Sequence, residues 1–181
     1  ALVFQISPLP GRVLADLDGL IARLHEVLRS AQRVKTRLPA AVVAVEVRNP
    51  QWLAPAFVDA LKDSGATYCL GLHPKMPAPA EQLPILRQLW PGPFVCRWNL
   101  NPRHGAYGYE AARESYAPFD QMVDPDPHTR EIVARVAAGT AGQDQPVYIT
   151  INNKAEGCAP ESVRALADAI QSLAARGRDR S

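Results

Sequence analysis

The stretch that decides the fold is AVVAVEVRNPQW, Ala41–Trp52. It reads as a buried β-strand that ends at Asn49-Pro50, because a proline restricts the residue before it and interrupts regular structure. Side chains alternate between the two faces of a strand, so Glu46 and Arg48 share one face at the carboxyl end of this strand. Burial of either charge is costly unless the charge is paired or hydrogen-bonded. We therefore expect a specific use for Glu46 and Arg48 at this position.

The rest of the chain repeats the same unit of an apolar strand, a loop and an amphipathic helix. The pattern predicts five strands, at LVFQISP, VVAVEVR, TYCLGLHP, FVCRWNL and PVYITINN. It predicts helices at residues 12–35, 54–62 and 82–89, from 126 to just before Gly139, and from Pro160 onward. Parallel strands need a crossover connection, which a helix supplies, so this alternation predicts an α/β fold.

One face of every predicted strand carries polar or small residues toward its carboxyl end. These residues are Gln5 and Ser7; Glu46 and Arg48; Cys69, Gly71 and His73; Arg97 and Asn99; Thr150 and Asn152. An open doubly wound sheet has helices on both faces, whereas a (β/α) barrel directs one face of each strand to a shared axis. The sequence also lacks GxGxxG and GxxxxGK[ST] motifs. We therefore predict a parallel TIM-type barrel.

The length of 181 residues limits how much of a barrel the chain can hold. A complete TIM barrel takes about 250 residues and eight βα units, and the pattern supplies about five. We expect an incomplete barrel domain at residues 1–176 that lacks N-terminal units, followed by a solvated tail at residues 177–181.

Composition and charge indicate a globular protein, with 47% hydrophobic and 21% charged residues. The formal net charge of +2 gives no argument for nucleic acid or an anionic membrane. No apolar run reaches the roughly 20 residues of a membrane span, and the first residues do not resemble a signal peptide, so we expect a soluble, cytoplasmic protein. Cys69, Cys96 and Cys158 lack CxxC spacing, which predicts reduced, buried thiols. Neither a cofactor nor an oligomeric state is indicated.

Four stretches occur in order along the chain: FQISP, AVEVRNPQW, CRWNLNPRHGAYGY and VYITINNKAEGCAP. In combination they resemble the YecE-like family of domains of unknown function, and the chain resembles the later part of the family domain. The resemblance implies a TIM-barrel fold and no secure biochemical function. It places family motif positions on Glu46, Arg48, Trp52, Arg97, Tyr107, Asn152 and Asn153.

The chemistry of a ligand site follows from the residues at the predicted barrel mouth. Arg48 and Arg97 project from separate strands, with Lys154 just beyond the last strand, and such a cluster suits phosphate or carboxylate. Neutral donors and acceptors come from Asn99, Asn152 and Asn153. Glu46 is the candidate general base. The alternative is an internal Glu46–Arg48 salt bridge that closes the mouth.

Aromatic residues near the mouth have two interpretations each. Residues 103–116 bring Tyr107, Tyr109 and Tyr116 close to Trp98, and aromatics beside glycines can stack on a sugar or base, or can pack a loop against the barrel. Trp52 either caps the site or fixes its helix to the sheet.

Histidines and carboxylates near the mouth raise the possibility of a metal site. His73, His104, Glu46 and Glu156 are residue types that bind zinc or manganese. They lack HxxE or HxH spacing, so we predict no metal site.

Three functions remain. The first is a barrel enzyme or binding protein for a small anionic ligand, phosphorylated or polyhydroxylated, in which Arg48 and Arg97 bind charge and Glu46 assists proton transfer. The second is a nucleic-acid-binding or phosphodiester-processing barrel. It requires a basic stripe into the mouth, formed by Arg12, Lys75, Arg103 and Lys154. The third is a non-catalytic barrel in which the polar ring is structural.

Overall fold

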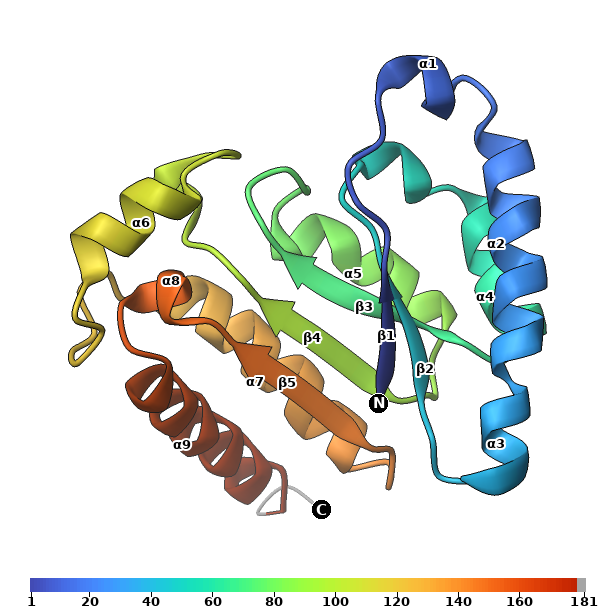
Figure 1. Cartoon of the computed structure of the whole chain (residues 1–181). Helices are drawn as coiled ribbons and strands as arrows, with labels where there is room; N and C mark the ends of the chain where they lie inside the picture. Colours follow the sequence, from blue (N-terminus) through green and yellow to red (C-terminus); the bar gives the residue numbers. More distant parts are fainter. Residues whose placement is uncertain (179–181) are drawn as a thin grey trace.

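The computed structural model describes residues 1–178 and contains a five-stranded sheet. The strands are β1 (Leu2–Gln5), β2 (Val43–Glu46), β3 (Thr67–Leu72), β4 (Phe94–Trp98) and β5 (Val147–Ile151). Neighbouring strands are parallel and follow chain order from β1 to β5. The sheet is curled into a half-barrel (Figure 1). The predicted α/β class and the five parallel strands are therefore confirmed.

Strand order explains why the long helices pack on one face of the sheet. A right-handed crossover between strands in chain order always places its helix on the same side. The long helices are α2 (Leu17–Ala31), α4 (Pro55–Ser64), α5 (Pro79–Gln88), α7 (Pro127–Ala141) and α9 (Ala159–Arg178). Together with one face of the strands they form the main hydrophobic core, on the convex side of the sheet (Figure 1).

Alternation along each strand divides the side chains between this core and the concave face. Val43, Val45 and Val47 of the β2 segment are buried in the main core. Ala44 belongs to a separate small apolar cluster on the concave face, together with Val42, Cys69 and Val95. Glu46 lies two residues beyond Ala44 and is level with Gln5 of β1. The concave face is thus apolar at its base and polar toward the carboxyl ends of the strands.

The predicted helix at residues 12–35 is wrong in detail. The segment forms α1 (Gly11–Leu14), α2 and α3 (Arg33–Arg37). Asp16 interrupts it, because the backbone of Asp16 is not helical. Its side chain caps α2 by accepting a hydrogen bond from the Gly19 amide at 3.2 Å. Propensity alone does not show this break, since aspartate is tolerated inside helices.

Several further elements differ from the prediction. Helix α5 begins at Pro79 instead of residue 82. Helix α7 continues through Gly139 to Ala141, because burial of Ala137 and Thr140 on that helix outweighs the roughly 1 kcal/mol helix penalty of a glycine. Two short helices, α6 (Tyr109–Tyr116) and α8 (Asn153–Glu156), were not predicted. Helix α9 includes the backbone of residues 177–178, and the rest of the predicted tail, residues 179–181, lies outside the described residues.

Short elements gather at the carboxyl ends of the strands (Figure 1). They are α1, α6, α8 and the two 3₁₀ helices η1 (Pro50–Trp52) and η2 (Pro102–His104). This end of the half-barrel is therefore built from loops and single turns, the usual carriers of function on a rigid scaffold. Within residues 1–178, no helix is long and apolar enough to cross a membrane.

Candidate functional site

Glu46 is the centre of a polar cluster on the concave face. Its side chain is fully buried, and its Oε1 lies 2.8 Å from Arg48 Nη2. Asn99 Nδ2 donates to the same oxygen at 3.2 Å, and Arg97 pairs with Oε2. The structure therefore brings together Glu46, Arg48, Arg97 and Asn99, and the Glu46–Arg48 salt bridge is present.

Gly71 makes the contact between Arg97 and Glu46 possible. Strand β3 lies between β2 and β4, so the two side chains meet across an intervening strand whose neighbours are each about 4.8 Å away. Gly71 pairs in register with Arg97, and a Cβ atom at Gly71 would lie 3.3 Å from Cγ and Oε1 of Glu46. Arg97 Nη1 also donates to Gln5 Oε1 on β1 at 2.9 Å. The glycine leaves the space that this cross-strand network uses.

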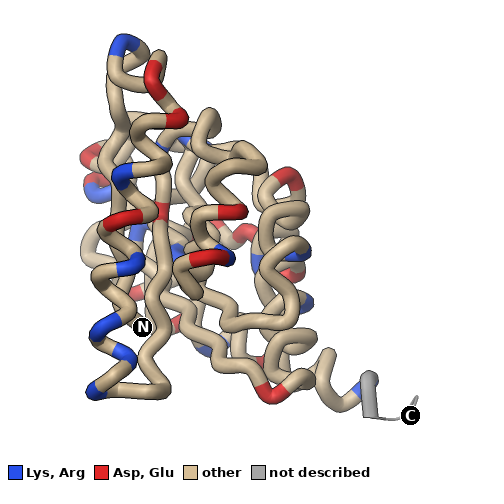
Figure 2. The backbone as a smooth tube through the Cα atoms, turned by 90° about the vertical axis from the view of Figure 1, so that its right-hand side faces the viewer, with Lys and Arg blue, Asp and Glu red and all other residues tan. Residues whose placement is uncertain are grey.

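The cluster carries more positive than negative charge. Two guanidinium groups share the single carboxylate of Glu46. The Arg48 side chain is 9% exposed and its Nε has no hydrogen-bond partner in the described part of the chain, whereas the Arg97 side chain is 32% exposed. Elsewhere, positive and negative residues are interspersed along the backbone (Figure 2). The excess charge at Glu46 is therefore a local property of the concave face.

Cys69 lies on the same face, level with Glu46. Burial, together with the nearby Glu46 carboxylate, raises the pKa of its thiol to about 12, although Arg97 and Arg48 act in the opposite direction. A thiol with a raised pKa is protonated at neutral pH, which disfavours nucleophilic attack by Cys69. Cys69, Cys96 and Cys158 are free and buried, as predicted.

The tyrosine-rich segment, residues 103–116, includes most of η2 and all of α6 and lies near the carboxyl ends of β3 and β5. The rings of His73 and Tyr109 stack with centroids 6.2 Å apart. Lys75 Nζ lies 4.1 Å from the ring centroid of Tyr107, and Lys154 Nζ lies 5.3 Å from that of Tyr109. These cation–π contacts connect this segment to two other segments of the rim. Tyr107 is 87% exposed.

Three other candidate residues have contacts that support the fold. Asn152 Oδ1 accepts from the Lys154 amide at 2.9 Å and caps α8. Asn153 Oδ1 accepts from the Ala159 amide at 2.8 Å, at the start of α9. Trp52 is 2% exposed and packs edge-on against Phe57 in the main core. Of the two interpretations of Trp52, its contacts match packing.

A second buried ion pair, Glu156–Arg130, was not predicted. Glu156 is fully buried, and its Oε1 also accepts from the Asp126 amide at 2.6 Å. Its main-chain oxygen accepts from Val123 and Asp124 at 2.8 and 3.0 Å. The only sequence signal was an acidic residue a few positions after the last strand, which does not distinguish a ligand from a structural anchor.

Gly157 allows the loop around Val123 to pack closely against the end of α8. Its φ is +115°, and a Cβ atom would lie 2.7 Å from the Val123 amide nitrogen, so the position favours glycine on both counts. Glu46 and Glu156 belong to different ion-pair clusters. Among residues 1–178, no group of three or more His, Cys, Asp or Glu side chains could hold a metal ion.

His73 is expected to make stability depend on pH. Burial, together with the positive charges of Arg48 and Lys75, lowers its pKa from 6.5 to about 4. Because the unfolded state then binds the proton first, unfolding free energy should fall as the pH decreases from 6.5 to about 4. Urea unfolding across this window measures the effect. His73→Gln cannot titrate and should give a flatter profile; the same slope in both proteins would contradict the assignment.

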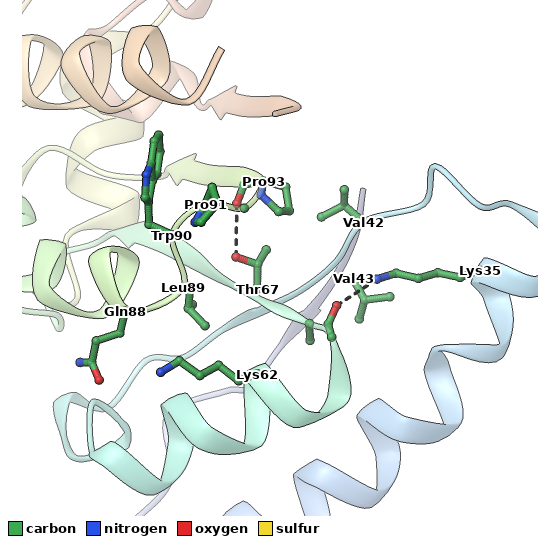
Figure 3. A pocket seen from close by; sticks show the side chains of 13 residues that line it. Lys35, Val42, Val43, Lys62, Thr67, Gln88, Leu89, Trp90, Pro91 and Pro93 are labelled. Carbon is green, nitrogen blue, oxygen red and sulfur yellow. Dashed lines mark hydrogen bonds between the residues drawn. The ribbon is translucent and has the colours of Figure 1, made fainter. Parts of the chain in front are cut away.

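A cavity of about 360 Å³ lies at the opposite end of the sheet and contains two lysines (Figure 3). Lys35 Nζ donates to the Gly65 oxygen at 2.9 Å, where α4 ends in a left-handed residue. Lys62 lies in the last turn of α4. The carboxyl end of a helix favours cations, so the end of α4 explains both lysines without a ligand.

Comparison with protein-family models matches residues 1–180 to the family described as "Protein of unknown function DUF72". Comparisons with curated proteins and with solved structures give no match. The family match covers the four stretches that carry the resemblance noted in the sequence. The chain therefore belongs to the DUF72 family, which is the YecE-like family of domains of unknown function.

Proposed function

We propose that the concave face binds a small anionic ligand, phosphorylated or polyhydroxylated, at the carboxyl ends of the strands. The observation that carries the proposal is that Arg48 and Arg97 share one carboxylate. An anion on the exposed side of Arg97 would neutralise the remaining charge. Guanidinium groups suit this role because they bind phosphate and carboxylate through two parallel hydrogen bonds.

The architecture supports this location. A TIM-type barrel has its strands in chain order, its helices on the convex face and polar residues on the concave face. The half-barrel shares these features, and we interpret it as part of such a barrel. Sites of TIM-barrel enzymes lie at the carboxyl ends of the strands. This analogy supports the place of the site and leaves the reaction open.

In this proposal Glu46 positions the two arginines and does not act as a free general base. A general base needs an oxygen that can reach the proton of the substrate. Both oxygens of Glu46 contact guanidinium groups, and Asn99 adds a further bond. These contacts support Glu46 as the residue that positions Arg48 and Arg97. Proton transfer by Glu46 would require a ligand that displaces one of them.

The rim supplies the remaining ligand candidates. Lys154 and Tyr107 each make a cation–π contact near the carboxyl ends of the strands, and Asn99 donates to Glu46. Asn152 and Asn153 remain candidates through their amide nitrogens, since their oxygens cap helices. The core position of Trp52 gives no support for a ligand contact.

Calorimetric titration with inorganic phosphate tests the proposal. Arg97→Met removes the exposed charge while Arg48 and Asn99 still contact Glu46, so we expect phosphate affinity to fall roughly 10- to 100-fold, the loss of one charged hydrogen bond. Arg113→Met removes an exposed charge that pairs with Glu110 and is the matched control. Equal phosphate binding by wild type and Arg97→Met would overturn the proposal.

Arg97→Met and two lysine variants separate the two alternative functions from this proposal. A nucleic-acid site predicts duplex DNA binding that weakens steeply with salt, and loss of that binding in Lys75→Met or Lys154→Met. Arg103, also on the expected stripe, is already paired with Asp124. A purely structural cluster predicts that no anion binds and that Arg97→Met changes stability alone.

A further inference from the structure

A second cavity opens beside the carboxyl ends of β3 and β4, on the helix-bearing side of the sheet. Its volume is about 460 Å³. Buried Leu72, Trp98 and Leu100 form an apolar wall, and the β3–α5 loop, η2 and the start of α7 surround it. Apolar cavities of this size with a few polar groups are typical of small-molecule sites.

Buried hydrogen bonds fix the walls of this cavity. Gln82 is fully buried, donates to the Pro77 oxygen at 2.7 Å and accepts from the Tyr68 hydroxyl at 2.6 Å, which holds the β3–α5 loop. Asn101 Nδ2 donates to the Ala155 oxygen at 3.0 Å and holds the chain that enters η2. Because the walls are already ordered, a ligand loses little free energy in arranging them.

Two polar side chains line the cavity and have capacity to bind. Asp126 Oδ1 accepts from the Thr129 amide at 3.0 Å, and no residue in the described chain donates to Oδ2. His73 Nδ1 accepts from the Lys75 amide at 3.1 Å, so the neutral ring carries its proton on Nε2. Asp126 thus offers a hydrogen-bond acceptor and His73 a donor, and His128 and Thr129 also line the cavity.

The charges around the cavity are of both signs. An anion bonded at Asp126 would face the Asp126 carboxylate. A cation bonded at His73 would meet the positive charges of Arg48 and Lys75, which lie outside the cavity lining and act against protonation of His73. Like charges brought together in a partly desolvated site repel strongly. An uncharged ligand avoids both repulsions.

We propose that this cavity binds an uncharged aromatic or heteroaromatic ring with an amide-like group. The ring packs against Leu72, Trp98 and Leu100, the donor of the group bonds to Asp126, and the acceptor bonds to His73. The site is separate from the proposed anion site, so Arg97→Met should leave it unchanged.

Benzamide, benzoate and benzamidine test the proposal, because they share one ring and differ in charge. Each is titrated into the whole ¹⁵N-labelled chain and followed by NMR. We expect benzamide to shift the amide signals of Gly105, Ala106 and Thr129, which line the cavity. We also expect it to bind more tightly than both ions, by roughly ten-fold over benzoate.

Two variants and one control locate the site and test its charge. Ala106→Phe fills the cavity and should abolish benzamide binding, while Ala111→Phe, at an exposed position of α6, should not. Asp126→Asn keeps an acceptor for the Thr129 amide, removes the charge, and should raise the affinity for benzoate.

Three results would overturn the proposal. They are benzamide binding that survives Ala106→Phe, benzoate or benzamidine binding as tightly as benzamide, and no benzamide binding at about 20 mM, where a ligand of this size would still be detected. If Ala106→Phe does not fold, the relative affinities of the wild type for the three ligands test the proposal.

Discussion

Glu46→Ala is expected to lower the free energy of unfolding by about 3 kcal/mol, because it leaves the buried Arg48 and the partly buried Arg97 without their shared carboxylate. In a chain of this length that loss corresponds to a decrease of about 9 °C in Tm. Urea unfolding and thermal unfolding measure the two quantities.

Anion rescue distinguishes a ligand site from a structural ion pair. Inorganic phosphate can occupy the space of the missing carboxylate and contact both guanidinium groups, so it should stabilise Glu46→Ala more than wild type. Saturating phosphate restores about 2.7 kcal/mol when its concentration is 100 times its Kd. Sodium chloride at matched ionic strength is the control.

Further substitutions check this interpretation. Glu46→Gln keeps the shape of the side chain and removes its charge, so it should be destabilised for the same reason. Combining Glu46→Gln with Arg48→Met removes the buried unpaired cation and should recover part of the stability. If phosphate stabilises every variant equally, the rescue does not occur at this cluster.

Glu156→Gln is expected to cost a similar amount, about 3 kcal/mol, because Arg130 would remain mostly buried beside a neutral amide. The bonds that Glu156 accepts from Val123, Asp124 and Asp126 connect α8 to the loop before α7. Amide hydrogen exchange at Asp126, whose amide donates to the Glu156 side chain, should therefore become faster in the variant. Urea unfolding gives the change in global stability.

Two controls separate the buried pair from surface electrostatics. Arg135→Met breaks the exposed Glu131–Arg135 pair on the same helix, α7, and should change stability by less than about 0.5 kcal/mol. Arg130→Met added to Glu156→Gln should restore part of the loss, since no buried charge then lacks a partner. A double variant less stable than Glu156→Gln would show that Arg130 contributes mainly through packing.

Local patterns predicted the strands better than the helices and loops. The alternation in Ala41–Trp52 correctly separated Val43, Val45 and Val47 from Glu46 and Arg48, because odd- and even-numbered residues of a strand point to opposite faces. Helix ends depend on side-chain caps and packing, so the break at Asp16 did not follow from apolar spacing. Helix α6 lies in a polar, tyrosine-rich stretch and is held by Leu100, Ala112 and Tyr116 packing together.

The candidate site was predicted in part. Placement of Arg97 and Asn99 on the same face as Glu46 followed from alternation, and their contact with Glu46 is observed. The roles of Asn152 and Asn153 as helix caps did not follow, because an asparagine after a strand has the same sequence pattern whether it caps a helix or binds a ligand. Glu156 and its partner Arg130 are 26 residues apart, which no local pattern connects.

The sequence by itself determined the α/β class, the parallel strands and the polar face, because each depends on periodicity within a short segment. The tertiary structure alone decided that Arg97 reaches across β3 to Glu46. That contact depends on the order of the strands, the curl of the sheet and the missing side chain of Gly71 between them. These are relations between segments far apart in the chain, so only the folded sheet brings them together.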